Sequence, residues 1–374
     1  MPTRVLSINT GIMGHASLAR ELQLALSARE EVHFTTELLP RLIEKDTFGK
    51  VLRRLVMRPI PGLPMPMRRL RSETVASWMC SRALTRLSDR DYDVLHIHTQ
   101  ALGLLRPRTD LPYVVSLDAT IPALNRVRAL RDVETRLMRG LEHRCLRDAA
   151  GVVTLTEWAR ASAHDDYGVD AIAIHPPMPV PRLTARRRGP TTTRGLRFLF
   201  VGNDLERKGG ILLVHAFAKW WSNDHQLDMV CDDPRLPRIC RGVSRLRIHD
   251  RNSRTPSTLT ELYEAADIFF LPTVEEAYGL VLLEAMSFQI PVVTTSVMAV
   301  PEVVGFGIAG PIVPPRDLAA LRAAGDALIM DPAKRATCGR AGYDLVARRN
   351  DPVHVGDAWE RVFLHAHQSS ATPG

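Results

Sequence analysis

Long apolar runs are missing from this sequence. No run approaches the ~18–20 residues that a membrane-spanning helix needs, and the apolar stretch within the N-terminal segment MPTRVLSINT is too short for a signal peptide. A hydrophobic content of 45% and a charged content of 24% are typical of a soluble globular protein. We therefore expect a cytoplasmic protein, and its 374 residues are enough for two domains, each with its own core.

Cysteine is scarce and shows no pairing pattern. The five cysteines are scattered, odd in number, and include no C-x-x-C pair. Neither a disulfide framework nor a zinc site is supported, so we expect reduced, buried thiols. The acidic pair Asp232-Asp233 precedes Pro234, which is typical of a turn rather than of a metal site.

Lysine is also scarce, because only five of the 49 basic residues are lysines. The net charge of +8 and the pI of about 9.6 favour anionic partners such as nucleotide sugars, acidic lipids or acidic glycans. Nucleic acid is not favoured, since no recognition module of interleaved aromatic and basic residues is present.

Acidic residues are absent between Asp46 and Glu73, where seven basic residues fall. Four prolines in this stretch, ending with Pro66, should break any long helix and leave the loop MRPIPGLPMPMRR. Such a loop is usually just solvated, but it leaves open a peripheral contact with an anionic membrane at the inner face. The basic residues are Lys50, Arg53, Arg54, Arg58, Arg68, Arg69 and Arg71.

The most informative stretch is 267–293, which reads as strand, loop, helix and strand. Ile268–Leu271 is an apolar run that stops at Pro272, and Gly279 opens a segment of good helix formers. The first free amides of that helix, from Gly279, Leu280 and Val281, form a place for an anion such as phosphate.

Two carboxylates flank this anion site. Glu276 precedes the helix and Glu284 lies within it, and carboxylates accept hydrogen bonds from hydroxyl groups. The pair suits a ligand that is both phosphorylated and polyhydroxylated, as a nucleotide sugar is. The alternative is that Glu276 caps the helix and Glu284 is merely solvated.

The motif E-A-Y-G-L-V-L-L-E-A-M, with seven residues between Glu276 and Glu284, resembles the signature of the family 4 retaining glycosyltransferases of GT-B fold (glycosyl transferases group 1). The resemblance implies that Glu276 contacts the donor sugar and Glu284 the ribose, with Tyr278 and Gly279 beside them. It also implies metal-independent catalysis and no cofactor other than the nucleotide-sugar substrate.

A second glycine turn, Gly202 to Gly210, follows the predicted strand Arg197–Val201. In the family this turn carries cations that grip the donor diphosphate, and Lys208 matches that lysine. The usual arginine is replaced by Asn203, so we expect Arg207 to supply the second cation. His249, at the end of a later strand, is expected to border the nucleotide base.

In the N-terminal half, Gly14 and His15 resemble residues of a family loop that faces the interdomain cleft. His98 ends the predicted strand Val94–His98 and is a candidate acceptor contact. Asp118 stands at or beside the position where the family usually has a histidine near the reacting sugar. It is therefore a candidate catalytic residue together with Lys208 and Glu276.

The expected fold class is α/β, with two Rossmann-like domains facing a central cleft. We expect an acceptor-side domain (1–178), a proline-rich linker (179–194), a donor-binding domain (195–350) and a C-terminal helix and tail that cross back to the first domain (351–374). The predicted strands are Val5–Ile8, Val94–His98, Tyr113–Leu117, Gly151–Leu155, Ile172–Ile174, Arg197–Val201, Gln226–Val230, Arg245–Ile248, Ile268–Leu271 and Ile290–Val293.

The expected activity is transfer of a hexose from a UDP- or GDP-linked sugar to an acceptor hydroxyl in glycan, glycolipid or natural-product synthesis. The stereochemical retention comes from the resemblance alone. Alternatives are a nucleotide-sugar-binding protein without transferase activity, and another GT-B enzyme such as an epimerase or a phosphorylase. A nicotinamide-dependent dehydrogenase is disfavoured, because the first glycine turn lacks the G-x-G-x-x-G pattern.

Overall fold

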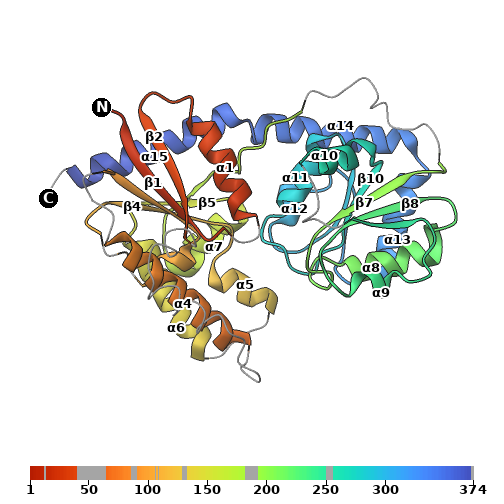
Figure 1. Cartoon of the computed structure of the whole chain (residues 1–374), viewed down its shortest axis with the longest axis horizontal. Coiled ribbons are helices and arrows are strands. Elements are labelled where there is room, and N and C mark those ends of the chain that lie inside the picture. The colour runs from red at the N-terminus through yellow and green to blue at the C-terminus, as the bar shows by residue number, and fades with distance from the viewer. Residues whose placement is uncertain are drawn as a thin grey trace. The chain divides into compact units, whose positions relative to one another are not determined.

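The computed structural model describes residues 1–11, 14–39, 65–85, 91–105, 107, 109–128, 133–181, 193–249 and 256–371. The chain separates into two compact units, each built on a six-stranded parallel sheet with helices on both faces (Figure 1). Unit 1 comprises Met1–Pro177 and Pro352–Gly374, and unit 2 comprises Met178–Asp351.

The sheet of unit 1 has the strand order β2-β1-β3-β4-β5-β6. The order reverses between β1 and β3, and in open parallel sheets such a reversal is where loops part and a ligand can bind. The strands are β1 (Thr3–Asn9), β2 (Val32–Leu38), β3 (Val94–His98), β4 (Tyr113–Leu117), β5 (Gly151–Thr154) and β6 (Ile172–Ala173). The helices are α1 (His15–Leu26), α4 (Met65–Leu84), the 3-10 turn η1 (Gln100–Leu102), α5 (Ile121–Arg128), α6 (Val133–Arg147), α7 (Glu157–Tyr167) and α15 (Pro352–Ala371).

Alternation along the strands supplies two apolar faces in unit 1. Val5 and Val94 are paired in register and face α1 and α15, whereas Leu6 and Leu95, the next pair, face α4 and α6. Figure 1 shows α4 and α6 together on one side of this sheet. Because both faces are covered, the strands are almost continuously apolar.

The sheet of unit 2 has the order β12-β11-β10-β7-β8-β9, with its reversal between β10 and β7. The strands are β7 (Arg197–Val201), β8 (Gln226–Val230), β9 (Leu246–His249), β10 (Ile268–Leu271), β11 (Val292–Thr295) and β12 (Ile312–Val313). The helices are α8 (Gly210–Ala216) with the π-helical turn η2 (Phe217–Trp221), α9 (Leu236–Ile239), α10 (Pro256–Ala265), α11 (Leu280–Ser287), α12 (Val300–Val303), α13 (Leu318–Ile329) and α14 (Pro332–Arg349).

Aromatic side chains fill the core of unit 2. Phe198 of β7 and Phe270 of β10 both contact Trp221 on one face, at ring centroid distances of 5.6 and 5.5 Å. The next residue, Phe269, points to the opposite face and contacts Tyr263 of α10 at 6.1 Å. The indole of Trp221 donates to Asp326 of α13 at 2.8 Å, which satisfies its polar atom inside the core.

The predicted strands are all present, although β11 begins two residues later than predicted. Strands β2 and β12, helices α4, α5 and α9 and the turn η1 were not predicted. The prediction of a loop is wrong for Met65 to Arg71, because α4 begins at Met65 with Pro66 in its first turn, where a missing N–H costs nothing. The remainder of the basic stretch, Lys50 to Arg58, lies outside the described residues.

Two helical glycines differ sharply in their surroundings. In α14, a Cβ at Gly339 would overlap the backbone oxygen of Gln289, whereas in α6 a Cβ at Gly140 would meet nothing within 4 Å. Gly339 therefore sets how closely α14 approaches the loop before β11, and Gly140 does not hold any neighbour.

We expect Gly339→Ala to destabilise unit 2 by about 1–3 kcal/mol, because the backbone carbonyl it meets cannot rotate away. Gly140→Ala is the matched control and should stabilise unit 1 by about 0.5–1 kcal/mol through its higher helix propensity. Thermal unfolding of both variants against wild type checks the pair, and equal shifts of the two midpoints would contradict the packing assigned to Gly339.

Candidate active site

The turn after β7 is shaped by its glycines. Gly209 has φ +74°, and a Cβ there would overlap the backbone oxygen of Pro272 in the turn after β10. At Gly202, a Cβ would lie 3.1 Å from Cγ of Lys208, so the lysine stem folds back over the start of the turn. Only glycine at 209 permits this approach of two backbones.

Hydrogen bonds join the turn after β7 to the turn after β10. The backbone oxygen of Arg207 accepts from the amide of Val274 and from the hydroxyl of Thr273, both at 2.8 Å. The Arg207 guanidinium in turn donates to the backbone oxygen of Glu275 at 2.9 Å. Because β7 and β10 are neighbours at the reversal of strand order, the two predicted glycine turns are brought together.

Side chains of opposite charge lie together where these two turns meet. Glu276 forms a short ion pair with Lys208, and Nη1 of Arg207 lies 3.6 Å from the same carboxylate. The three side chains are largely buried, with exposed fractions of 11% for Glu276, 13% for Lys208 and 23% for Arg207. The structure thus brings Glu276 to Arg207 and Lys208, which precede it in the sequence by 69 and 68 positions.

Helix α11 begins at Leu280, directly after Gly279 with φ +84°. Its Glu284 accepts a 2.6 Å hydrogen bond from the hydroxyl of Tyr263, a buried residue of α10. Tyr263 carries no recognisable signal in the sequence, because its partner lies 21 residues away. The bond fixes the carboxylate of Glu284, which lies about one turn after the start of α11.

Two other residues that are predicted to bind the nucleotide-sugar donor form contacts with side chains of this chain. Tyr278 is buried, burial raises its pKa to about 12, and Asn350 Nδ2 donates to its hydroxyl at 3.4 Å. His249 ends the edge strand β9, two strands away from β7, with Nε2 2.5 Å from Oδ1 of Asp228. Their contact with a donor stays a prediction, and Asp228 is an addition that the sequence did not suggest.

The predicted residues of unit 1 gather at the carboxyl end of its sheet. Helix α1 starts at His15, after Gly14, and the ring of His15 meets that of His98 edge-on at 4.8 Å. Nδ1 of His15 lies 2.8 Å from Oγ1 of Thr10. Burial lowers the pKa of His15, and the negative charge of nearby Asp118 partly opposes this.

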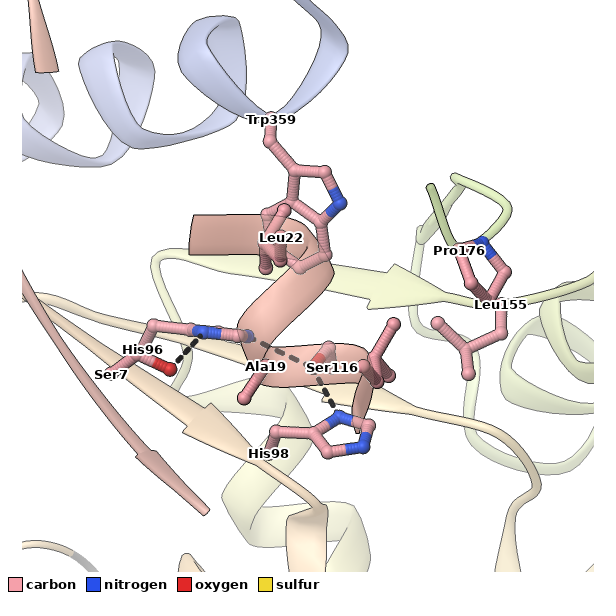
Figure 2. A pocket seen from close by; sticks show the side chains of 10 residues that line it. Ser7, Ala19, Leu22, His96, His98, Ser116, Leu155, Pro176 and Trp359 are labelled. Carbon is pink, nitrogen blue, oxygen red and sulfur yellow. Dashed lines mark hydrogen bonds between the residues drawn. The ribbon is translucent and has the colours of Figure 1, made fainter. Parts of the chain in front are cut away.

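Buried polar side chains extend inward from His98 (Figure 2). Its Nδ1 lies 2.8 Å from the hydroxyl of Ser116, which is also 2.8 Å from Nε2 of His96, and Nδ1 of His96 lies 2.9 Å from the hydroxyl of Ser7. Burial lowers the pKa of His96 to about 3. Burial also places the pKa of His98 well below its usual value, helped by His15 and His96, with the Ser116 backbone opposing.

A small cavity of about 10 Å³ adjoins these side chains, room for about one water molecule. Its lining is mostly apolar and includes Leu18, Leu22, Leu155 and Trp359 as well as the two histidines (Figure 2). It is therefore a packing feature of unit 1 and too small to hold a sugar.

Gln100, next to the end of β3, is held by the protein. Its amide donates to Glu142 Oε1 at 2.8 Å and to the backbone oxygen of Ala119 at 2.9 Å. Glu142 is fully buried and also accepts from the amide of Ile121 at 2.8 Å and from the hydroxyl of Tyr167. This carboxylate joins η1, α5, α6 and α7 beside the site.

Comparison with known proteins identifies the family to which this chain belongs. Residues 195–331 match the model "Glycosyl transferases group 1", and residues 13–178 match the model "Glycosyltransferase Family 4". The chain belongs to the family 4 glycosyltransferases. The resemblance inferred from the Glu276–Glu284 motif is thereby confirmed.

Among the relatives of this glycosyltransferase is a D-inositol 3-phosphate glycosyltransferase of Corynebacterium efficiens, 28% identical over 326 residues that cover 75% of this chain and 77% of the relative. An α-maltose-1-phosphate synthase of Mycolicibacterium smegmatis is 26% identical over 329 residues, which cover 79% and 84%.

Solved structures agree on the fold. A sucrose-phosphate synthase of Thermosynechococcus elongatus has a TM-score of 0.74 at 20% identity, covering 99% of this chain and 100% of that one. Anabaena HepE, solved in complex with UDP-glucose, has a TM-score of 0.67 at 17% identity, covering 99% and 100%. The α/β fold of this glycosyltransferase, with two Rossmann-like units, is therefore of the GT-B type, as predicted.

Within the described ranges, no helix is long and apolar enough to cross a membrane. The same part of the chain contains no group of three or more His, Cys, Asp or Glu side chains arranged to hold a metal ion.

The buried neutral His96 predicts a pH dependence of stability. Between pH 6.5 and about 3 the unfolded chain protonates this histidine and the folded one does not, so stability falls as the pH falls. At pH 4.5 the expected loss is on the order of 2 kcal/mol relative to pH 7.5.

Urea unfolding at pH 7.5 and 4.5 measures this loss. His96→Gln should reduce the loss by this amount, because glutamine does not titrate, and the remainder includes the contribution of buried His98. His33→Gln, at an exposed position of β2, is the control and should show the loss of wild type. An identical loss in wild type and His96→Gln would show that His96 is not kept neutral in the folded state.

Proposed function

We propose that this glycosyltransferase moves a hexose from a UDP- or GDP-linked sugar to an acceptor hydroxyl, with retention of anomeric configuration. The observation that carries the proposal is the contact of the two glycine turns, which places Lys208 and Arg207 against Glu276. A diphosphate needs the cations and a sugar needs the carboxylate, so one ligand that contains both can engage all three.

Donor binding would exchange partners within this cluster. Glu276 now pairs with both cations, Arg207 pairs also with Asp204 at 3.4 Å, and a bound diphosphate would take over Lys208 and Arg207. The carboxylate would then be released to accept hydrogen bonds from the sugar hydroxyls. The two negative charges of the diphosphate would match the two cations, and the sugar hydroxyls would satisfy the carboxylate.

In the reaction, the bond between the sugar and the β-phosphate oxygen breaks while the acceptor oxygen attacks the anomeric carbon. Negative charge develops on the leaving phosphate as the sugar becomes oxocarbenium-like. Lys208, Arg207 and the first amides of α11 would stabilise that charge, an effect of ~3–4 kcal/mol for one well-placed donor. The leaving phosphate would accept the proton of the acceptor hydroxyl, so no separate base is required.

Glu284 would bind the ribose hydroxyls of the nucleotide. Its orientation by Tyr263 supports this role, because a carboxylate already fixed by one hydrogen bond loses less freedom on binding. Tyr278 and His249, the latter at the end of β9, would complete the donor site.

In unit 1, we propose that His15, His98 and Asp118 contact the acceptor or the transferred sugar. Their shared place at the carboxyl ends of β1, β3 and β4 supports this, since ligands of parallel sheets bind there. Asp118 would accept a hydroxyl hydrogen bond in place of the family's usual histidine.

The comparisons support the choice of donor and acceptor class. HepE was solved with UDP-glucose, and the two relatives named above are called after a phosphorylated polyol and a phosphorylated sugar. A net charge of +8 suits such anionic substrates. We propose metal-independent catalysis in the cytoplasm, with peripheral contact to anionic lipid at the inner membrane face.

Lys208→Ala should lower kcat at least ~100-fold, because the leaving phosphate loses a charged donor. Hydrolysis or transfer from UDP- and GDP-sugars measures the effect, and thermal unfolding verifies that the variant is folded. Lys219→Ala, at an exposed lysine of η2 in the same unit, is the control and should retain wild-type turnover. Near-normal turnover of Lys208→Ala would remove this lysine from the mechanism.

Binding and turnover assays on the wild-type protein distinguish the rival function, which is nucleotide-sugar binding without transfer. It would bind nucleoside diphosphate through Lys208 and Glu284, yet it would show no turnover with any acceptor.

A further inference from the structure

The loops that follow β3 and β4 carry the candidate acceptor residues of unit 1. His98 is the last residue of β3, and Asp118 directly follows β4. The two strands are parallel neighbours, so both loops leave the same edge of the sheet, but the pairing of the strands ends at His98 and Ser116. Beyond that pair, other contacts have to fix where the two loops lie relative to each other.

One side chain, Glu142 of α6, is hydrogen-bonded to both loops. Its Oε1 accepts from Nε2 of Gln100, in the loop after β3, at 2.8 Å. Its Oε2 accepts at 2.8 Å from the amide of Ile121, where the loop after β4 enters α5. Nε2 of Gln100 also donates to the backbone oxygen of Ala119 at 2.9 Å, so this side chain links the two loops directly as well.

These hydrogen bonds lie away from solvent. The exposed fractions are 0% for Glu142, 1% for Ala119, 2% for Ile121 and 5% for Gln100. Asp118, in contrast, is only half-buried. Because the linked groups are buried, a partner that is lost is not simply replaced by bulk water, and each hydrogen bond is costly to break.

Both oxygens of Glu142 serve as acceptors. The amide of Ile121 can only donate, and the backbone oxygen of Ala119 can only accept, so the atom of Gln100 that faces Ala119 and Glu142 belongs to the NH2 group. A glutamine at position 142 would have the same shape, but its own NH2 group would face one of these two donors. A carboxylate is also favoured beside the N-terminus of α5, where Ile121 begins the helix.

We propose that Glu142 is a positioning residue for the acceptor side of the reaction. It holds the loops after β3 and β4 in one arrangement, with Gln100 as the bridge between them, so that His98 and Asp118 contact the acceptor together. This inference rests on the proposed function for the identity of the ligand, but not for the link between the loops.

Glu142→Gln should release both loops. Hydrogen exchange of the full chain, measured by mass spectrometry without substrate, should be at least ~10-fold faster than in wild type over residues 99–105 and 118–124, and unchanged over β1. Wild-type exchange in both segments of a folded Glu142→Gln variant would overturn the proposal.

Two further variants separate the loops from the rest of unit 1. Gln100→Met breaks the bridge and leaves Glu142 in place, so it should also speed exchange in both segments, and it decides the matter if Glu142→Gln does not fold. Tyr167→Phe is the matched control, because Tyr167 of α7 donates to the same carboxylate but belongs to neither loop. Equally fast exchange in Tyr167→Phe would mean that Glu142 supports helix packing in general, which contradicts the proposal.

Steady-state kinetics distinguish positioning from a loss of folding. With UDP-glucose as donor and D-inositol 3-phosphate as the acceptor probe, Glu142→Gln and Gln100→Met should lower kcat/KM for the acceptor ~10–100-fold. The Kd of UDP, whose proposed contacts all lie in unit 2, should change less than ~2-fold, and Tyr167→Phe should retain wild-type kinetics. A parallel loss of UDP binding would contradict a role confined to the acceptor side.

Failure of this inference and failure of the proposed function give different results. A wild-type protein that transfers no sugar, together with loops released by Glu142→Gln, would retain the link between the loops and remove only its ligand. Transfer that depends on Lys208, together with loops unaffected by Glu142→Gln, would do the opposite.

Discussion

The approach of Gly209 to the backbone oxygen of Pro272 is the constraint on which the site of unit 2 depends. No side chain fits there, so the turns after β7 and β10 meet along their backbones. The hydrogen bonds of Arg207, Thr273 and Val274 then fix one turn to the other. Lys208 and Glu276 become neighbours as a consequence, because Lys208 directly precedes Gly209 and Glu276 follows shortly after Pro272.

The site of unit 1 follows a different principle. There the sheet core contains polar side chains, and hydrogen bonds between strands compensate for their burial. The aromatic rings of Trp359 and Phe363 from α15 pack against His96 at 4.9 and 5.7 Å. Residues from the C-terminal end of the chain thus help to keep this histidine neutral and fixed.

Much of the fold could be predicted from the sequence, because buried parallel strands are apolar runs followed by glycine or polar turns. Strand β2, with the sequence VHFTTEL, was missed since its polar residues interrupt the run. Helix α4 cannot be recognised in the same way, because Pro66 indicates a break, although the first turn of a helix tolerates proline.

Candidate site residues can be recognised in the sequence where spacing forms a motif, and not where the partners are distant. Glu276, Glu284 and Lys208 stand beside glycine turns that mark them. Tyr263 and Ser7 have no such marker, because the partner of each is defined only by the packed structure. Ser7 meets His96 across 89 residues, through strand register alone.

A crystal structure of the protein soaked with UDP would test the central claim most directly. The account predicts the β-phosphate within hydrogen-bond distance of Lys208 and Arg207, between the turns 202–209 and 272–279, with Glu276 released from Lys208. UDP bound elsewhere, or bound while the Lys208–Glu276 pair stays intact and without phosphate contact, would contradict it.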